Sequence, residues 1–284
     1  NKKMTAEDIT LTVKLLLGID ASTKFELNPP ITIPETKSES LWGNTFVKIC
    51  GVVSYGIETG DYNSNEQFDK VKTTKHAITT TDRKYTLTGG TKAIIDITKD
   101  TLTISGASAG TSGTLIKRGA GTLILKAFNA YTGKTIISQG AVIAGVNSPS
   151  GAIGAFGNSS SAVVLGDALT GNLSPSLYSI NASTIQRPIT IDSFVTAGEY
   201  KIGVNDATSS IFSGSITMKQ PLSIIAPASG TVILTNTINS NGFKLTKMNQ
   251  GTLRKATLPL NLSGDFEILA GDFDAYGMDV SVLG

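Results

Sequence analysis

The sequence predicts an all-β protein: a right-handed parallel β-helix (β-solenoid) with an N-terminal capping region. First, short segments of alternating apolar residues, separated by Gly, Asn and Ser, follow one another along most of the 284 residues. Second, a strand-turn pattern in residues 115–142 returns 130 residues later, from Leu245. Third, charged residues make up only 16% of a chain with 30 glycines, which favours turn-rich β-structure over helix bundles. Since such a repeated unit cannot bury its own apolar face, it must stack on its neighbours, which favours a β-helix over a sandwich or barrel.

The two copies of the pattern lie near residues 113–145 and 243–273. In each copy, glycines separate short strands of alternating apolar residues, and the second copy matches the first apart from a one-residue shift. The repeat residues are Leu115, Lys117, Gly119, Gly121, Leu123, Asn129, Tyr131, Gly133 and Gly140 in the first copy, and Leu245, Lys247, Gly251, Leu253, Gly264 and Gly271 in the second.

Each repeat residue has a predicted structural role. The glycines of the first copy are expected to take positive φ at corners where the chain turns between faces. Asn129 is expected to hydrogen-bond the backbone at a turn, or to join a ladder of asparagines on adjacent coils. The apolar residues should point inward and stack on their equivalents above and below; they are Leu115, Leu123, Leu125, Ile137 and Val142.

The order L-x-K-x-G-x-G-T-L-x-L, followed by N-x-Y-T-G-x-T-x-I-x-x-G, resembles the autotransporter-associated β-strand repeat of bacterial surface proteins. Its two halves are residues 115–125 and 129–142 here. The second copy is more degenerate, and Asn249 stands where the family has a glycine. The resemblance covers roughly residues 85–273 and implies a β-helical passenger segment exposed outside the cell.

Two regions are predicted along the chain. Residues 1–78 are expected to form an N-terminal β-rich cap or assembly region, because a stacked-coil fold must shield its first apolar rung. Within this region, residues 9–17 alternate strictly and favour a strand, although Thr5 followed by Asp8 resembles a helix-capping box. Residues 79–284 are expected to form the parallel β-helix. At roughly 20–25 residues a coil, this region would make about eight to ten rungs and a rod on the order of 40–50 Å long.

Short strands are expected throughout the second region, at four to six residues each. They are expected at Tyr85–Thr88, Lys92–Ile97, Thr101–Ile104, Gly113–Lys117, Thr122–Leu125, Lys134–Ile137, Ala141–Ala144, Ala162–Leu165, Ile189–Ile191, Tyr200–Val204, Ser215–Met218, Leu222–Ile225, Thr231–Leu234, Phe243–Thr246 and Phe266–Leu269.

Residues 146–184 interrupt the repeat with loop compositions such as Val146–Gly151, Asn158–Ser161 and Gly166–Ser176. Loops that leave one side of a β-helix often carry recognition. The simpler alternative is that these segments are turns between coils.

The side chains that usually perform catalysis or bind metals are sparse. His76 is the only histidine, which leaves no His-rich zinc site and a Ser-His-Asp triad only through His76 itself. Cys50 is the only cysteine, so no intramolecular disulfide can form, and its surroundings favour a buried apolar side chain. We therefore expect no catalytic residue, no metal and no cofactor.

One acidic cluster is the exception. Asp265 and Glu267 alternate with apolar residues, as do Asp272 and Asp274, and Asp279 follows. Polysaccharide-cleaving β-helix enzymes need two or three such acids on one face of consecutive coils. The alternative is that these are ordinary solvated acids whose like charges discourage edge-to-edge aggregation.

The sequence therefore predicts an extracellular or cell-surface structural or adhesive rod, associated with the bacterial outer membrane after secretion. Its expected partners are host or neighbouring-cell surface molecules, or other copies of itself. One alternative is a subunit of an extracellular fibre or surface layer that grows by end-to-end stacking; a polysaccharide-active enzyme is a second. A net charge of +2 without a basic patch argues against nucleic acid, and no apolar run reaches the roughly 18 residues needed to span a bilayer.

Overall fold

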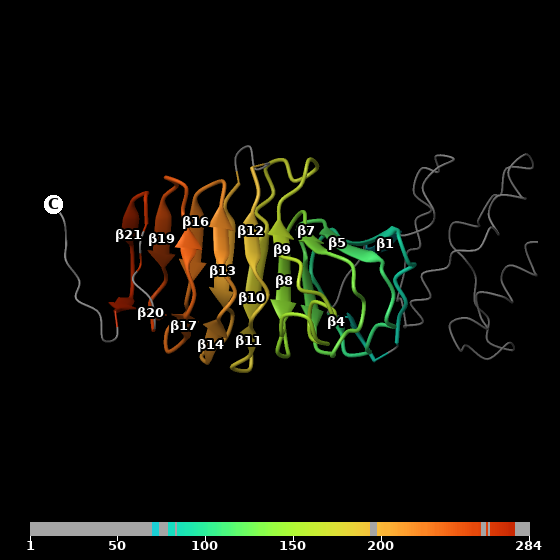
Figure 1. Ribbon diagram of the computed structural model, residues 1–284. Helices are drawn as coiled ribbons and strands as arrows, with labels where there is room; N and C mark the ends of the chain where they lie inside the picture. The colour runs from blue at the N-terminus through green and yellow to red at the C-terminus, as the bar shows by residue number, and fades with distance from the viewer. Residues whose placement is uncertain are drawn as a thin grey trace, which may run out of the picture.

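The computed structural model describes residues 70–73, 79–82, 84–193, 198–256, 260 and 262–275. Its regular elements in these residues are all β-strands, and the named strands pair only in parallel. The strands wind into an elongated solenoid in which successive coils lie side by side (Figure 1). The predicted class, an all-β parallel solenoid, is confirmed. The predicted cap lies almost wholly outside the described residues, and its boundary at residue 78 stays a prediction.

Three parallel sheets form the walls of the solenoid. Sheet 1 has eight strands: β1 (Lys70–Thr73), β3 (Lys92–Ile97), β5 (Thr114–Arg118), β7 (Thr135–Ile137), β9 (Val163–Leu165), β12 (Ile189–Ile191), β15 (Ile216–Met218) and β18 (Ile238–Asn239). Sheet 2 has nine: β2 (Thr79–Thr81), β4 (Thr101–Ile104), β6 (Thr122–Leu125), β8 (Ala141–Ala144), β10 (Ser176–Ser179), β13 (Tyr200–Val204), β16 (Leu222–Ile225), β19 (Leu245–Met248) and β21 (Phe266–Ile268). Sheet 3 has five: β11 (Thr184–Ile185), β14 (Ser209–Phe212), β17 (Thr231–Leu234), β20 (Thr252–Lys255) and β22 (Asp272–Asp274).

Each strand pairs with the strand one coil earlier, in register. Leu102 pairs with Leu123 and Leu123 with Val142, steps of 21 and 19 residues. Val142 pairs with Leu177, a step of 35 residues, because the loop region is inserted in that coil. Before β11, only isolated bridges mark the third wall, such as the one from Tyr85 to Ser108. In the early coils that the structure describes, the third wall therefore has isolated bridges in place of regular strands.

The core is a column of inward side chains from all three sheets. Burial alternates along each strand, as in the fully buried Leu123 and Leu125 on either side of the half-exposed Ile124. Leu115, Ile137 and Val142 are also fully buried, so the inward residues of the repeat stack between coils. Because each contributes the burial of one aliphatic side chain, each stabilises the fold by roughly 1.5–3 kcal/mol.

Several strands lie outside the segments predicted as strands, notably β10 and β11. β10 reads Ser-Leu-Tyr-Ser and buries a serine, Ser179, whose hydroxyl donates to the carbonyl oxygen of Gly203 at 3.2 Å. The segment predicted as a strand at Tyr85–Thr88 contains only the bridge at Tyr85. In β10, therefore, a serine bonded to the next coil takes an inward position where the prediction relied on an apolar residue.

The two copies of the repeat occupy different walls. In the first copy, Leu115 and Lys117 lie in sheet 1 and Leu123 in sheet 2. In the second copy, Leu245 and Lys247 lie in sheet 2 and Leu253 in sheet 3. The repeat is therefore a strand-corner-strand unit that fits either corner of the solenoid.

Candidate binding surface

Glycines of the repeat lie at two corners: Gly119, Gly121 and Gly140 where sheet 1 turns into sheet 2, and Gly133 where the third wall turns into sheet 1. Gly119 and Gly140 have φ of +76° and +67°, in the left-handed region that side chains disfavour. Gly121 and Gly133 do not have positive φ. An added Cβ at Gly121 would lie 2.5 Å from Cγ2 of Ile97, and one at Gly133 would collide with a backbone carbonyl of the preceding coil. Backbone conformation thus requires glycine at two of these positions, and close packing of coils requires it at the other two.

The second copy of the repeat makes a similar turn at the corner between sheets 2 and 3. Gly271 has φ +76°, and Asn249, which stands where the family has a glycine, has φ +65°. Asparagine tolerates the left-handed region better than most side chains, so the substitution keeps the corner. An added Cβ at Gly251 would collide with the carbonyl oxygen of Pro227 in the coil before.

The lysine of the repeat ties two coils together at the corner. Lys117 is fully buried, and its Nζ donates to the carbonyl oxygens of Arg118 at 2.7 Å and Gly119 at 2.8 Å. A third bond, of 3.1 Å, reaches the carbonyl of Gln139 in the next coil. Lysine supplies three donors on a flexible stem, which this corner uses in full.

Lys247 does the same in the second copy. Its Nζ donates to the carbonyls of Met248 at 2.8 Å, Asn249 at 2.7 Å and, in the next coil, Ala270 at 3.0 Å. The two lysines therefore have a shared role, which sequence reasoning treated only as a repeat position.

Burial changes the titration of these lysines. Desolvation lowers the pKa of Lys117 from 10.5 to about 7, opposed by the negative charge of Asp96. Desolvation also lowers the pKa of Lys247, opposed by Asp272. The three carbonyl oxygens around each Nζ favour the charged ammonium and oppose both shifts.

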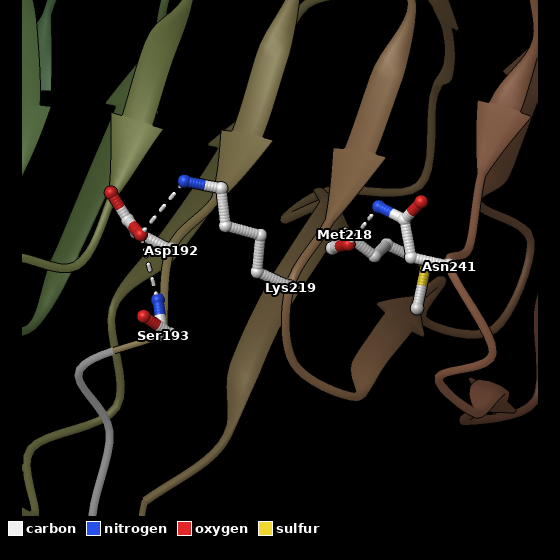
Figure 2. Close-up of polar contacts among 5 residues, drawn as sticks. All are labelled: Asp192, Ser193, Met218, Lys219 and Asn241. Carbon is white, nitrogen blue, oxygen red and sulfur yellow. Dashed lines mark hydrogen bonds and ion pairs between the residues drawn. The ribbon is translucent and has the colours of Figure 1, made fainter.

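At the corner between sheets 1 and 2, where Lys117 lies, later coils without this lysine are linked by other side chains. Figure 2 shows Asn241, whose Nδ2 donates to the carbonyl of Met218 at 2.7 Å, and Lys219, whose Nζ lies 3.2 Å from Oδ1 of Asp192. The same Asp192 oxygen accepts from the backbone N–H of Ser193 at 2.9 Å. The Asn241 and Lys219 contacts each link neighbouring coils, so polar bridges recur at this corner.

Asn129 links its own coil to three others at the third wall. Its Oδ1 accepts from the Ser108 N–H at 2.9 Å and from the Tyr85 hydroxyl at 3.1 Å, both in earlier coils. Its Nδ2 donates to the carbonyl of Ala155 at 2.9 Å, in the following coil. The side chain is fully buried, and all these contacts are within the protein.

The first part of the loop region folds into the solenoid. Gly154 pairs antiparallel with Asn129, and Ser148 pairs in parallel with Ile185 of β11. Phe156 is fully buried beneath them. The segment is thus a wedge between two coils of the third wall, and its longest exposed run is the tip at residues 150–153.

Arg187 anchors the base of this wedge. Its Nη1 donates to the carbonyl of Phe156 at 2.6 Å and its Nε to that of Ser161 at 2.7 Å, while the side chain is fully buried. Beside it, the hydroxyl of Tyr131 lies 2.7 Å from that of Thr135, and burial raises the pKa of Tyr131. Burial lowers the pKa of Arg187. The guanidinium provides two donors in a fixed plane, which suits two carbonyls of one loop.

Two large apolar side chains are exposed where the wedge meets its neighbouring coil. Phe128 and Ile153 are 51% and 50% exposed, and each is next in sequence to a member of the Asn129–Gly154 pair. Exposed aromatic and aliphatic side chains held on a rigid wall are typical of contact surfaces. We call Phe128 and Ile153, with the tip 150–153, the wedge surface.

A second exposed tip lies at the corner of sheets 1 and 2, at residues 168–172. Leu169 is 56% exposed, and its carbonyl accepts from Nε2 of Gln139 at 2.6 Å. Asp167 accepts from the hydroxyl of Ser138 at 2.6 Å, so the preceding coil fixes this tip as well.

The acidic cluster is divided between two walls. Glu267 lies in β21 of sheet 2 and pairs with Lys244 at 2.5 Å. Asp274 lies in β22 of sheet 3 and pairs with Arg254 at 2.7 Å. The idea that one face collects Asp265, Glu267, Asp272 and Asp274 is therefore wrong, since β21 and β22 belong to different sheets. Asp279, His76 and Cys50 lie outside the described residues.

In the part of the chain that the structure describes, three or more His, Cys, Asp or Glu side chains nowhere gather as a metal site would require. Nor do these residues contain a helix long and apolar enough to cross a membrane.

The fold and the corner geometry define a parallel β-solenoid built with strand-corner repeats. Residues 115–144, which contain β5 to β8 and the Lys117 corner, match the family described as Passenger-associated-transport-repeat. This match confirms the resemblance predicted from the repeat.

A curated relative is also similar over part of the chain. The chain is 46% identical over 82 residues to a protein named "Adhesin BmaC autotransporter" from Brucella suis biovar 1 (strain 1330). The aligned part is 28% of this chain and 2% of that protein. No solved structure matches the chain significantly.

Proposed function

We propose that this chain is part of a β-helical passenger that stands outside a bacterial cell as a structural or adhesive rod. The observation that carries the proposal is the passenger-type repeat at residues 115–144, placed on a parallel solenoid whose neighbouring coils are bridged by the repeat lysine. The named adhesin with a similar segment supports the adhesive form of the proposal. The solenoid supplies stiffness, and its walls and tips supply the surface for contact.

The wedge surface is the part of the rod that we propose binds a surface molecule. It combines exposed apolar side chains, Phe128 and Ile153, with a rigid base fixed by Arg187 and Asn129. A preorganised surface loses less conformational entropy on binding than a mobile loop does. A host or neighbouring-cell molecule is the proposed partner.

The test is adhesion of beads coated with the purified chain to host and bacterial cells. The variant Phe128→Ser with Ile153→Ser should reduce adhesion at least tenfold. The matched control is Leu169→Ser, which removes an equally exposed apolar side chain from the other tip and should leave adhesion unchanged. Equal adhesion of all three proteins would contradict the role of the wedge surface.

A fibre subunit is the second candidate function, and one observation favours it. Ile268 is in register with the buried Lys247, so it points along the core column, yet it is 46% exposed because no coil covers it among the described residues. Phe266 and Phe273 pack edge to face beside it, with ring centroids 4.9 Å apart. An apolar end of this kind can stack on another copy.

Light scattering over a concentration series, with negative-stain images of the same samples, separates the two functions. Filaments that Ile268→Lys abolishes would favour the fibre. Short rods at every concentration would favour the adhesin.

A further inference from the structure

One outward row of sheet 2 is apolar along almost the whole solenoid. Successive strands place these residues side by side, and Figure 1 shows their strands following one another from β8 to β21. Leu269 follows β21 directly and extends the row, since its N–H donates to the carbonyl of Lys247 beside Met248. The row consists of Ile124, Ile143, Tyr178, Gly203, Ile225, Met248 and Leu269.

The row points away from the core. Its neighbours in each strand, such as Leu123 and Leu125 around Ile124, or Leu222 and Ile224 before Ile225, are the buried ones. Exposure varies along the row: Ile143 and Gly203 are buried, and Leu269 is 58% exposed. The other members with side chains are half-buried.

The solenoid does not require apolar residues in this position. The second outward row of sheet 2 is mainly polar, with Thr122, Ala141, Ser176, Lys201, Ser223, Thr246 and Glu267. In sheet 1 the corresponding outward row begins with isoleucines but becomes Thr190, Thr217 and Asn239 in the later coils. A row that remains apolar on one wall only marks that wall as a contact surface.

The order of side chains in the row is self-complementary. Gly203 is its fourth and central member, with three larger side chains on either side. An added Cβ at Gly203 would collide with the carbonyl oxygen of Ile225, so the centre stays a notch. If a second copy is turned about a two-fold axis through Gly203, Tyr178 faces Ile225 and Ile143 faces Met248. The largest side chains then meet medium ones, and the two backbones approach most closely at glycine.

We propose that sheet 2 is the surface through which two copies of this chain pair side by side, with their long axes antiparallel. A two-fold axis makes the same patch serve both partners, as in most symmetric dimers. The proposal is independent of adhesion by the wedge surface, which lies on the third wall.

The charge on this wall permits such pairing. Its outward rows from β6 to β21 contain only two charged residues, Lys201 and Glu267, of opposite sign. Each is already paired within the chain, Lys201 with Glu199 at 2.9 Å and Glu267 with Lys244 at 2.5 Å. A second copy therefore meets an apolar centre and a neutral rim.

The size of the wall sets the expected strength. Seven strands about 4.8 Å apart and about four residues long give a flat face of roughly 29 by 13 Å. The area of this face, about 380 Å², is smaller than the roughly 800 Å² that each partner contributes to a stable complex. Pairing should therefore be weak, with a dissociation constant of about 0.1–1 mM in solution. On a cell surface, tethered copies would pair at a far higher effective concentration.

Sedimentation velocity of the purified chain tests the pairing. The mass of the wild type should rise between about 10 µM and 1 mM, as a dissociation constant in this range requires. Tyr178→Lys and Ile225→Lys should hold the chain monomeric at every concentration. The control Thr217→Lys adds the same charge to an outward position of sheet 1 and should behave like the wild type. A wild type that is monomeric at about 1 mM overturns the proposal, and so does association that both row variants retain.

Cysteine cross-linking tests the orientation and separates side-by-side pairing from end stacking. In a Cys50→Ser background, a mixture of Tyr178→Cys and Ile225→Cys chains should oxidise to a disulfide dimer at least five times faster than either variant alone. End-to-end stacking would give no disulfide in any combination, and parallel pairing would favour each variant with itself. Either of these results contradicts antiparallel pairing of sheet 2. Circular dichroism of every variant establishes that its β-structure is unchanged.

Discussion

At the scale of single residues, the solenoid depends on polar side chains that bond to the backbone of the neighbouring coil. Lys117, Lys247, Asn129 and Arg187 are all fully buried, and each donates to at least two backbone carbonyl oxygens. A buried charge is tolerated when its donors are all used. These four residues fix the distance between coils more strictly than aliphatic stacking can.

Loss of the lysine amine should destabilise the corner. Lys117→Met keeps the aliphatic stem but leaves three buried carbonyls without their donor, so the free energy of unfolding should fall by about 2–4 kcal/mol. The exposed Lys134 provides the control, since Lys134→Met should change it by less than about 0.5 kcal/mol. Urea unfolding followed by circular dichroism measures both, and equal values would show that the corner bonds contribute nothing.

The lowered pKa of Lys117 predicts that the stability of the fold depends on pH. Burial lowers the pKa of Lys117 to about 7, whereas the unfolded chain keeps about 10.5. Between these values the unfolded state binds more protons, so stability should rise with pH from 7 to about 10.5. The rise should be absent in Lys117→Met. Parallel stability curves for the two proteins over this range would mean that the carbonyl oxygens keep the ammonium charged.

Close packing at a corner glycine gives a separate prediction. Gly121→Ala places a Cβ 2.5 Å from Cγ2 of Ile97 and 2.8 Å from the carbonyl oxygen of Asp100, and should lower the melting temperature by several degrees. In Gly110→Ala the nearest atom would be 3.5 Å away, an ordinary contact. That variant should melt within about 1 °C of the wild type or slightly above it.

At the scale of elements, the alternating pattern predicted the more apolar strands correctly and missed the more polar ones. β3, β4, β6, β8, β12, β13, β16 and β17 have the predicted bounds, because apolar inward residues alternate with outward ones along each of them. β10 and β14 were not predicted, since serines occupy part of their inward or outward positions. The offset of the repeat by one wall could not be predicted, because a strand-corner-strand unit is compatible with any corner.

The candidate surface was predictable only in part. Loop composition indicated residues 146–184 as an interruption, but composition does not show that the first portion pairs with Asn129 and Ile185 on both sides. Arg187 gave no signal in the sequence, because its partners are backbone carbonyls 26 and 31 residues away. Because any residue provides a backbone carbonyl, the sequence does not show which side chains will bond to one. The role of Arg187 is therefore visible only in the folded structure.

The wedge should loosen when its anchor is removed. Arg187→Met leaves the carbonyls of Phe156 and Ser161 without their donors, and residues 149–161 should exchange amide hydrogens at least tenfold faster. The surface ion pair offers the control, since Lys219→Met removes only an exposed contact with Asp192. Hydrogen exchange read by mass spectrometry measures the segment directly, and unchanged protection in Arg187→Met would show that the pairing strands hold the wedge alone.

At the scale of the whole molecule, three parallel sheets in register make a rod in which each coil contacts mainly its two neighbours. Stability in such a fold is roughly a sum of coil and interface terms. Its walls differ in character: the third wall carries the wedge surface, sheet 2 the apolar row, and the end near β21 the exposed Ile268. A rod of this design presents three chemically different surfaces to its surroundings.

The most direct test of this account is disulfide trapping between successive coils, in a Cys50→Ser background. Thr190 and Thr217 are register partners on the outer side of sheet 1, and Asn239 lies one coil further along. The pair Thr190→Cys with Thr217→Cys should oxidise completely within one chain, because register partners lie within disulfide reach. The pair Thr190→Cys with Asn239→Cys is two coils apart, at about 9.6 Å, and should stay reduced within the chain. Failure of the first pair, or equal oxidation of both, would contradict the parallel in-register solenoid on which every other conclusion rests.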